Sequence, residues 1–134
     1  MAQRPLCPEC GHRGYIIVPG HCVYPKDSPY RNRPVARCEN PACDARASVH
    51  MAGPNVGKPM GTLAGLKTRL ARKGAHDAFD PLWKAGGMSR HDAYAMLAAV
   101  LRVHVEECHI GLFDVATCER VIAWARKARA RSVF

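Results

Sequence analysis

The chain carries CPECG at residues 7–11 and CENPAC at residues 38–43. Each stretch places two cysteines on one tight turn, so that both thiols can reach the same point. Two such pairs make the tetrahedral cage of four sulfurs that holds Zn(II) at about 2.3 Å from each sulfur. Pro8 and Gly11 suit the first turn, because proline presets one backbone φ and glycine accepts a positive one. The sequence therefore predicts one structural zinc ion with four ligands: Cys7, Cys10, Cys38 and Cys43.

Other uses of these cysteines are less favoured. Two disulfides would suit an oxidising compartment, whereas in a reducing one cysteine pairs more often bind a metal. His12 and Cys22 are weaker alternatives as ligands. A site closed by four sulfurs leaves no open coordination position, so we expect the ion to support the fold and not to activate water.

The composition is that of an ordinary globular protein with a strong basic balance. A length of 134 residues fits one domain, or one small module with a helical extension. No apolar run is long enough to span a membrane, and no secretory signal precedes the first cysteine pair. We therefore expect a cytoplasmic protein with no membrane partner.

The net charge is +9 and the pI is about 9.5, with most of the basic side chains being arginine. Because a guanidinium pairs bidentately with phosphate, this balance favours a polyanionic partner, most simply nucleic acid. The alternative is that the charge serves solubility alone. Charge by itself does not separate specific from incidental binding.

Residues 1–52 are predicted to form a zinc ribbon. The β-type run at 15–18 reads as a strand, 22–24 is expected to pair with it, and 45–51 reads as a strand after the second cysteine turn. Between them, the proline-rich stretch 25–34 is expected to be an exposed, basic loop. Such short strands need the metal in place of a hydrophobic core.

Residues 53–61 are rich in proline and glycine and read as a linker, and 62–134 read as a helical region with a basic C-terminal tail. Ser89 and Asp114 are expected to cap the second and third helices. The apolar stripe of the first helix is predicted at helical spacing: Leu63, Leu66, Leu70, Ala75, Ala78, Phe79, Leu82 and Trp83. The buried face of the second helix is predicted to be Tyr94, Leu97, Val100 and Leu101. The expected fold class is α+β, with an N-terminal four-cysteine zinc ribbon of short antiparallel strands packed with a C-terminal three-helix unit.

Candidate nucleic-acid contacts fall on three elements. Exposed arginines suit phosphates, and tyrosines suit stacking on bases. The ribbon candidates are Tyr24, Tyr30, Arg31, Arg33, Arg37 and Arg46. The first helix supplies Lys67, Arg69, Arg72 and Lys73, and the tail supplies Arg126, Lys127, Arg129 and Arg131. Each group could equally be a solvated face, and no helix-turn-helix or finger helix with base-reading residues is visible.

A small acid–base site can also be drawn. His76 and Asp80 lie one helical turn apart and can share a hydrogen bond, and His109 is a third candidate. The simpler interpretation has Asp80 capping the turn at Pro81 and His76 packed between helices. No nucleophile elbow or metal-binding carboxylate pair accompanies these residues. A second metal site at Cys108, His109 and Cys118, with His104, is disfavoured, since a free cysteine is usually a small buried hydrophobe.

Dense motifs across most of the chain resemble a known family. They are the two cysteine turns, then PMGTLA at 59–64, FDPLW at 79–83, MSR at 88–90 and HIGLFD at 109–114. The pattern resembles a small zinc-finger-containing domain family of unknown function, seen in bacteriophages and bacterial genomes. The spacing Cys-x4-Cys in the second turn is longer than is common there. The resemblance implies a zinc finger and a phage or mobile-element setting, with no established activity.

These observations predict a zinc-stabilised, basic, nucleic-acid-associated binding protein without enzymatic activity. The first alternative is a protein-binding adaptor or inhibitor that acts on a host nucleic-acid-processing or defence complex. The second is a small nuclease or hydrolase that uses His76, Asp80 and His109.

Overall fold

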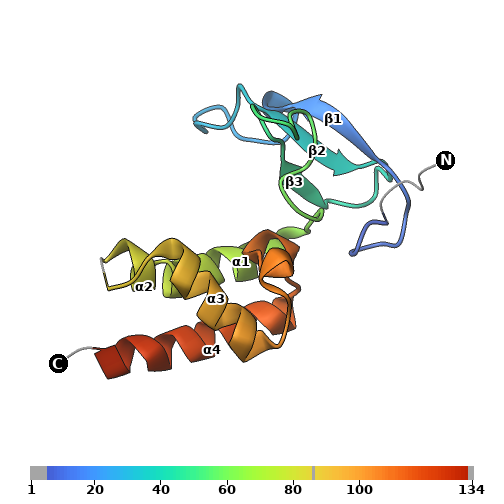
Figure 1. Ribbon diagram of the computed structural model, residues 1–134. Coiled ribbons are helices and arrows are strands. Elements are labelled where there is room, and N and C mark those ends of the chain that lie inside the picture. The colour runs from blue at the N-terminus through green and yellow to red at the C-terminus, as the bar shows by residue number, and fades with distance from the viewer. Residues whose placement is uncertain (1–5, 86, 133–134) are drawn as a thin grey trace. The chain divides into compact units, whose positions relative to one another are not determined.

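The computed structural model describes residues 6–85 and 87–132. The chain divides into two compact units, Met1–Leu66 and Lys67–Phe134. The first contains the strands and the second nearly all of the helical residues (Figure 1). This arrangement confirms the α+β class. No helix within the described residues is long and apolar enough to cross a membrane.

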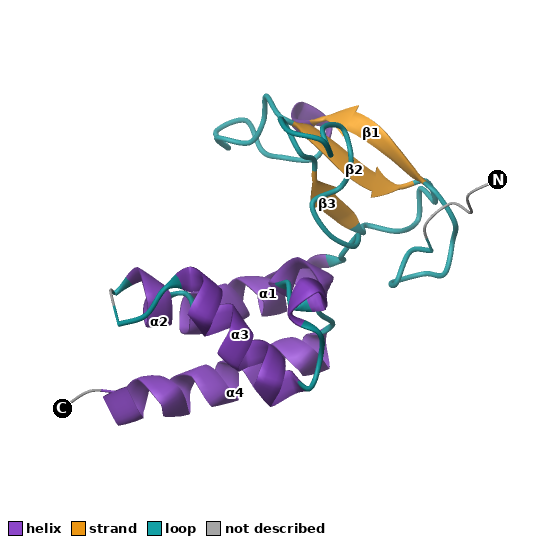
Figure 2. Cartoon of the chain, viewed as in Figure 1, coloured by secondary structure: helices purple, strands orange, loops and turns teal. Residues whose placement is uncertain are grey.

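The first unit is a zinc ribbon built on a three-stranded antiparallel sheet in the order β1-β2-β3 (Figure 2). Its strands are β1 (Tyr15–Pro19), β2 (Pro34–Cys38) and β3 (Arg46–Ser48). Pro34 begins β2, a position where a strand tolerates the missing N–H. The predicted alternation of cysteine turns and strands is confirmed.

The partner of β1 was predicted wrongly. Residues 22–24 do not pair with β1, because the chain turns through a 3-10 helix, η1 (Gly20–Cys22), directly after it. The N–H groups of Val23 and Tyr24 both donate to the Gly20 carbonyl, at 3.0 and 2.8 Å. The backbone of this segment is therefore committed to a turn, and β2 takes the place beside β1.

The two faces of the sheet differ in character. Ala36 and Cys38 of β2 are fully buried, and the core around them is made largely of alanine and cysteine, with Val49 and Leu63. Arg37 lies opposite Arg46 in the register of β2 and β3, so both belong to the other face. One face is thus committed to the small core and the other carries basic side chains.

The chain after the sheet returns to β3. The N–H of Met60 donates to the Ser48 carbonyl at 2.8 Å, and Arg46 and Ala64 exchange two hydrogen bonds of 3.0 Å. Residues 58–64 therefore cover the outer edge of β3, and the boundary between the units comes after the segment 53–61 that the sequence suggests as a linker.

The second unit contains three helices longer than two turns and several short ones. They are α1 (Leu66–Phe79), α2 (Pro81–Lys84), α3 (Arg90–Leu101), η2 (Val105–Glu107), η3 (Ile110–Leu112) and α4 (Val115–Ser132). Phe79, Leu97, Ile110 and Val121 are the largest fully buried side chains of its core. The helices therefore have a hydrophobic core of their own.

Three side chains that the helical spacing assigned to buried faces are exposed. Leu66 and Leu70 of α1 are 57% and 60% exposed, and Val100 of α3 is 38% exposed. The buried positions of α1 are Thr68, Ala75, Ala78 and Phe79. The core contacts of α1 thus lie mainly toward its C-terminal end, where Ala75, Ala78 and Phe79 join the cluster.

The caps predicted for the second and third helices are confirmed, whereas the Asp80 side chain makes no cap hydrogen bond at the turn that begins at Pro81. The Ser89 hydroxyl accepts a hydrogen bond from the N–H of Asp92 at 3.0 Å, at the start of α3. The Asp114 carboxylate accepts one from the N–H of Thr117 at 2.8 Å, at the start of α4. Each bond satisfies a backbone donor that the first turn of a helix leaves unpaired.

Replacing the second cap is expected to destabilise α4 in a pH-dependent way. Asp114→Ala should cost about 1 kcal/mol of unfolding free energy at pH 7. Hydrogen bonds from the Thr117 side chain and backbone hold the pKa of Asp114 below its usual value. The cap's contribution is therefore complete above the unfolded-state pKa of about 4 and is lost as the pH falls through the lower folded-state pKa.

Urea unfolding of the helical signal at pH 7 and at acidic pH measures this difference. Glu119→Ala removes an exposed carboxylate from the same helix and serves as the control, with an expected change within about 0.5 kcal/mol. Equal destabilisation by Asp114→Ala at both pH values would contradict the assignment of the ionised carboxylate as the cap.

Candidate functional site

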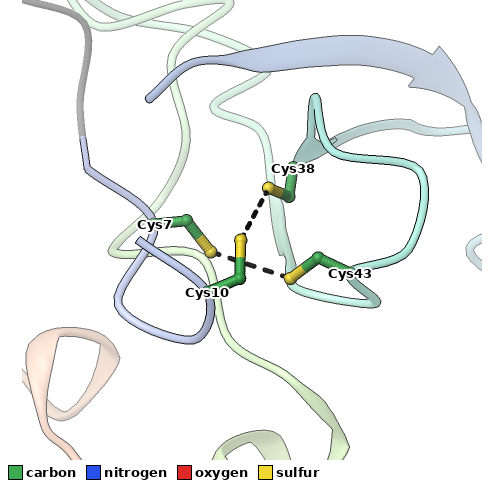
Figure 3. A group of neighbouring side chains, drawn as sticks. All are labelled: Cys7, Cys10, Cys38 and Cys43. Atoms are coloured by element: carbon green, nitrogen blue, oxygen red, sulfur yellow. Dashed lines mark hydrogen bonds between the residues drawn. The ribbon is translucent and has the colours of Figure 1, made fainter. Parts of the chain in front are cut away.

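Four thiols from two distant stretches of the ribbon meet at one point. Cys7 and Cys10 come from the turn before β1, Cys38 is the last residue of β2, and Cys43 lies in the turn between β2 and β3. Figure 3 shows the four side chains directed toward one another. The Sγ atoms of Cys7 and Cys43 are 3.8 Å apart, and those of Cys10 and Cys38 are 3.6 Å apart. All four sulfurs lie within 4.8 Å of one another.

These distances fit a tetrahedral zinc site. With each sulfur about 2.3 Å from the metal, the edge of a regular tetrahedron is about 3.8 Å. The donor set, four thiolates and no oxygen, is the one that structural Zn(II) prefers. The four cysteines thus hold one structural zinc ion, and a closed sulfur cage leaves it no position for a substrate.

Backbone geometry shapes both cysteine turns. Gly11 has φ +78°, a conformation that costs glycine little, and its N–H donates to the Cys7 carbonyl at 2.9 Å. In the second turn the Asn40 carbonyl accepts from the N–H of Cys43 at 3.0 Å, and its side-chain oxygen accepts from the N–H of Ala42 at 3.1 Å. Asn40 thereby folds the longer Cys-x4-Cys spacing into a compact turn.

Asn40 also joins the two turns. Its side-chain amide donates to the sulfur of Cys10 at 3.7 Å. An N–H donor to a ligand sulfur orients the ligand and offsets part of the negative charge of a four-thiolate site. Asn40 is a residue that the sequence analysis did not single out. Its signal is an amide side chain inside a cysteine turn, where Asn favours a local side-chain-to-backbone bond.

The thiols differ in how readily they ionise without the metal. A backbone hydrogen bond from His12 is the main cause that lowers the pKa of Cys10, to about 7. Burial is the main cause that raises the pKa of Cys43, to about 12, and it also raises the pKa of Cys38. Zinc must therefore displace protons from the buried thiols when it binds.

Fold and site together define a small structural-zinc protein, in which the metal holds a ribbon of short strands. The chain belongs to the family described as a zinc-finger-containing domain of unknown function, whose model matches residues 3–128. The resemblance seen in the sequence is thus confirmed. Neither the curated proteins nor the solved structures contain a match to this chain.

A second group of side chains gathers beside the sheet, on the loop between β1 and β2 and on β3. The rings of Tyr24 and Tyr30 are 5.8 Å apart between centroids and inclined by 46°. The guanidinium of Arg33 lies 5.5 Å from the centroid of Tyr30, and that of Arg46 lies 5.2 Å from the centroid of Tyr24. We call Tyr24, Tyr30, Arg33 and Arg46 the arginine–tyrosine cluster.

Three members of the cluster, Tyr24, Tyr30 and Arg33, border a pocket of about 220 Å³. Its walls are completed by side chains of β2, of β3 and of the returning segment: Pro34, Val35, Ser48, Val49, His50, Met51 and Met60. Two tyrosines, the guanidinium of Arg33 and an imidazole therefore face a space lined otherwise by apolar and small side chains.

Gly20 holds the loop of this cluster in place. A Cβ added at Gly20 would collide with the backbone carbonyl oxygens of Tyr30, Arg31 and Arg33. Only glycine allows the loop to approach the end of β1 so closely. No local sequence pattern indicates this role of Gly20, because the close approach comes from a segment ten residues away.

The remaining basic candidates differ in their surroundings. Arg31 donates to the Lys26 carbonyl at 3.5 Å, within the loop. Arg72 donates from Nε to the Phe113 carbonyl at 2.9 Å, and Lys73 pairs with Asp77 at 2.8 Å. Lys67 is exposed and Arg69 is half-buried on α1, and the tail residues lie exposed on α4: Arg126, Lys127, Arg129 and Arg131. The structure thus brings together four of the six ribbon candidates, and on α1 Arg72 and Lys73 bond within their own unit.

Of the three candidate catalytic residues, His76 and Asp80 form a pair. His76 Nδ1 lies 3.2 Å from an oxygen of Asp80, which also faces Lys84 at 3.9 Å. Within the described chain, no hydrogen bond or ion pair joins His109 to either residue. Among the described residues, the four zinc ligands are the only group of three or more His, Cys, Asp or Glu side chains placed to bind a metal.

Proposed function

We propose that the protein binds nucleic acid through the ribbon, with the arginine–tyrosine cluster as the contact surface, and that it acts as a binding module without catalysis. The observation that carries the proposal is the cluster itself. Two tyrosine rings and two guanidinium groups lie within 6 Å of a neighbour in the group. Proteins that bind single strands combine these same elements, aromatic rings for bases and cations for the backbone.

The charges around the cluster favour a polyanion. Arg37 and Arg46 lie directly opposite one another in the sheet, an arrangement of like charges that costs stability. Arg37 Nε is buried and has no hydrogen-bond partner among the described residues. Within the described residues, neither Arg33 nor Arg46 forms an ion pair with a carboxylate. Phosphate groups would offset this concentration of positive charge.

The tyrosines favour unpaired bases over a duplex. Tyr30 is 50% exposed, so part of its ring is open to a stacking partner. Stacking on an aromatic side chain contributes about 1–3 kcal/mol per base and requires a base that has left its own stack. The exposed basic tail of α4 suits the phosphate backbone, because such contacts position a nucleic acid without reading its sequence.

On the family resemblance alone, we further infer a phage or mobile-element setting.

The test is a salt series of binding to mixed-sequence single-stranded and duplex oligonucleotides. We expect tighter binding to the single strand. Arg33→Gln with Arg46→Gln should lower the slope of log K against log salt by about 1.4, because each phosphate contact contributes about 0.7 on a single strand. Tyr30→Leu should weaken binding with little change in the slope.

The control keeps the net charge equal to that of the double arginine variant. Lys26→Gln with Lys58→Gln removes two exposed cations from the same unit but outside the cluster. An equal loss from both double variants would mean that binding follows net charge and would contradict the cluster. Binding that hardly changes with salt would favour the adaptor. Cleavage of the oligonucleotide that depends on a divalent metal and is lost in His76→Ala would favour the nuclease.

A further inference from the structure

We propose that the helical unit binds an acidic, amphipathic helix of a partner protein in a groove between α3 and α4. The groove encloses about 510 Å³. Its lining comes from α2, the turn before α3, α3 and α4: Leu82, Met88, Met96, Trp124, Lys127, Ala128 and Arg131. This site is separate from the ribbon, and the proposal does not depend on nucleic-acid binding.

The apolar side chains of the lining are only partly shielded from solvent. Leu82 is buried at 8% exposure, whereas Met96 is 46% exposed. Trp124 packs with its inner side toward the core, where its ring centroid lies 6.3 Å from that of Phe79. An exposed methionine beside a half-buried tryptophan presents apolar area that can adapt to another side chain. Such a surface gains free energy when a partner covers it.

The spacing on α4 fits a helix as the occupant. Trp124, Lys127, Ala128 and Arg131 recur at intervals of three and four residues, so they form one face of α4. This face extends for about two turns, or about 10 Å along the helix. A partner helix can place apolar side chains at i, i+3 or i+4 and i+7 along such a wall.

The charges at the rim select an acidic partner. Lys127 and Arg131 border the groove, and after Glu119 the described part of α4 carries no acidic residue. On the opposite side, Asp92 lies one turn before Met96 on α3, with His91 Nδ1 3.6 Å from its carboxylate. The acidic edge of the partner helix is therefore expected to lie along α4.

The same charges argue against two other occupants. A second copy of this chain brings the same cationic rim and a net charge of +9, so the two copies would repel one another. A nucleic acid would gain from Lys127 and Arg131, but its phosphates cannot be buried against Leu82 and Met96 without a large desolvation cost. An acidic amphipathic helix satisfies both the apolar floor and the cationic rim.

The test selects helix-forming peptides from a displayed random library on the full-length, zinc-loaded protein. The expected winners carry apolar residues at helical spacing together with glutamate or aspartate. The affinity of a labelled winning peptide should fall at least tenfold for the Met96→Glu variant. It should fall as much for the double variant Lys127→Glu with Arg131→Glu. Met96 is exposed, so its replacement leaves the fold intact, which circular dichroism can verify.

A matched control uses the far side of the same helix. Arg126→Glu with Arg129→Glu makes the same change of charge on α4 at positions outside the groove lining. This variant should bind the peptide within about threefold of the wild type, since it keeps the rim and exerts only a long-range effect.

Three results would overturn the proposal. The first is selection of basic or uncharged peptides. The second is that the groove variants and the control variant bind the selected peptides equally well, or that no peptide is selected at all. The third is a stable dimer in sedimentation analysis that becomes monomeric in Met96→Glu, which would make a second copy of the chain the occupant.

Discussion

Removal of zinc by a chelator is expected to unfold the ribbon and to leave the helices folded. The buried cluster of the first unit contains Cys7 and Cys38 together with two alanines, Val49 and Leu63, and this is too little apolar surface to hold three short strands. Zinc binding contributes on the order of 10 kcal/mol to the folding of such units. The helical unit has a separate core around Phe79, Leu97 and Val121. Far-ultraviolet circular dichroism should therefore keep its helical minimum, while amide hydrogens of β1 to β3 lose their protection from exchange.

A single ligand substitution should have the same result. Cys38 is fully buried, and its loss would leave three sulfurs and an open side of the cage. Cys38→Ser should release zinc and unfold the ribbon. Cys22→Ser is the matched control, because Cys22 lies in the same unit, is exposed and stands outside the group of four sulfurs. A Cys38→Ser protein that retains one zinc per chain and protected strands would show that the ligand assignment is wrong.

The zinc centre was predictable because its information is local. Two cysteines on a short turn can face only one point, and Gly11 fits the positive φ that the turn requires. The helix caps were predictable for the same reason, since Ser89 and Asp114 act within three residues of their own position. For these two features the physical cause lies within one turn of chain, and the sequence was sufficient to predict them.

The path of the chain between β1 and β2 could not be predicted, because its cause is distant in sequence. Gly20 leaves room for the backbone carbonyl groups of Tyr30, Arg31 and Arg33, and no local sequence pattern indicates that contact. Tyr24, Tyr30, Arg33 and Arg46 were each candidates by residue type, but their assembly into one cluster follows from this loop. The exposure of Leu66 and Leu70 was missed for a related reason. A helical stripe fixes the face of a helix but not how far along the helix the core extends.

Truncation of Phe79 is expected to produce the largest loss of stability in the helical unit. Phe79 is fully buried at the end of α1, and its ring meets that of Tyr94 edge-on at 4.7 Å between centroids. Phe→Ala in a packed core costs about 3–5 kcal/mol, from lost transfer free energy and the cavity left behind. A unit of this size has a total stability of about 5 kcal/mol. Phe79→Ala should therefore leave the helices partly unfolded at room temperature, as measured by thermal and urea denaturation.

Leu70→Ala provides the comparison on the same helix. Leu70 is 60% exposed, so its truncation should change the unfolding free energy by less than about 0.5 kcal/mol. A conservative Phe79→Leu variant should keep the unit folded but let Trp124, which packs 6.3 Å from Phe79, settle toward the gap. That movement would alter tryptophan emission and weaken peptide binding in the groove, while the zinc content stays at one ion per chain. If Leu70→Ala instead costs as much as Phe79→Ala, then α1 buries its N-terminal half, and the assignment of the core to its C-terminal end is wrong.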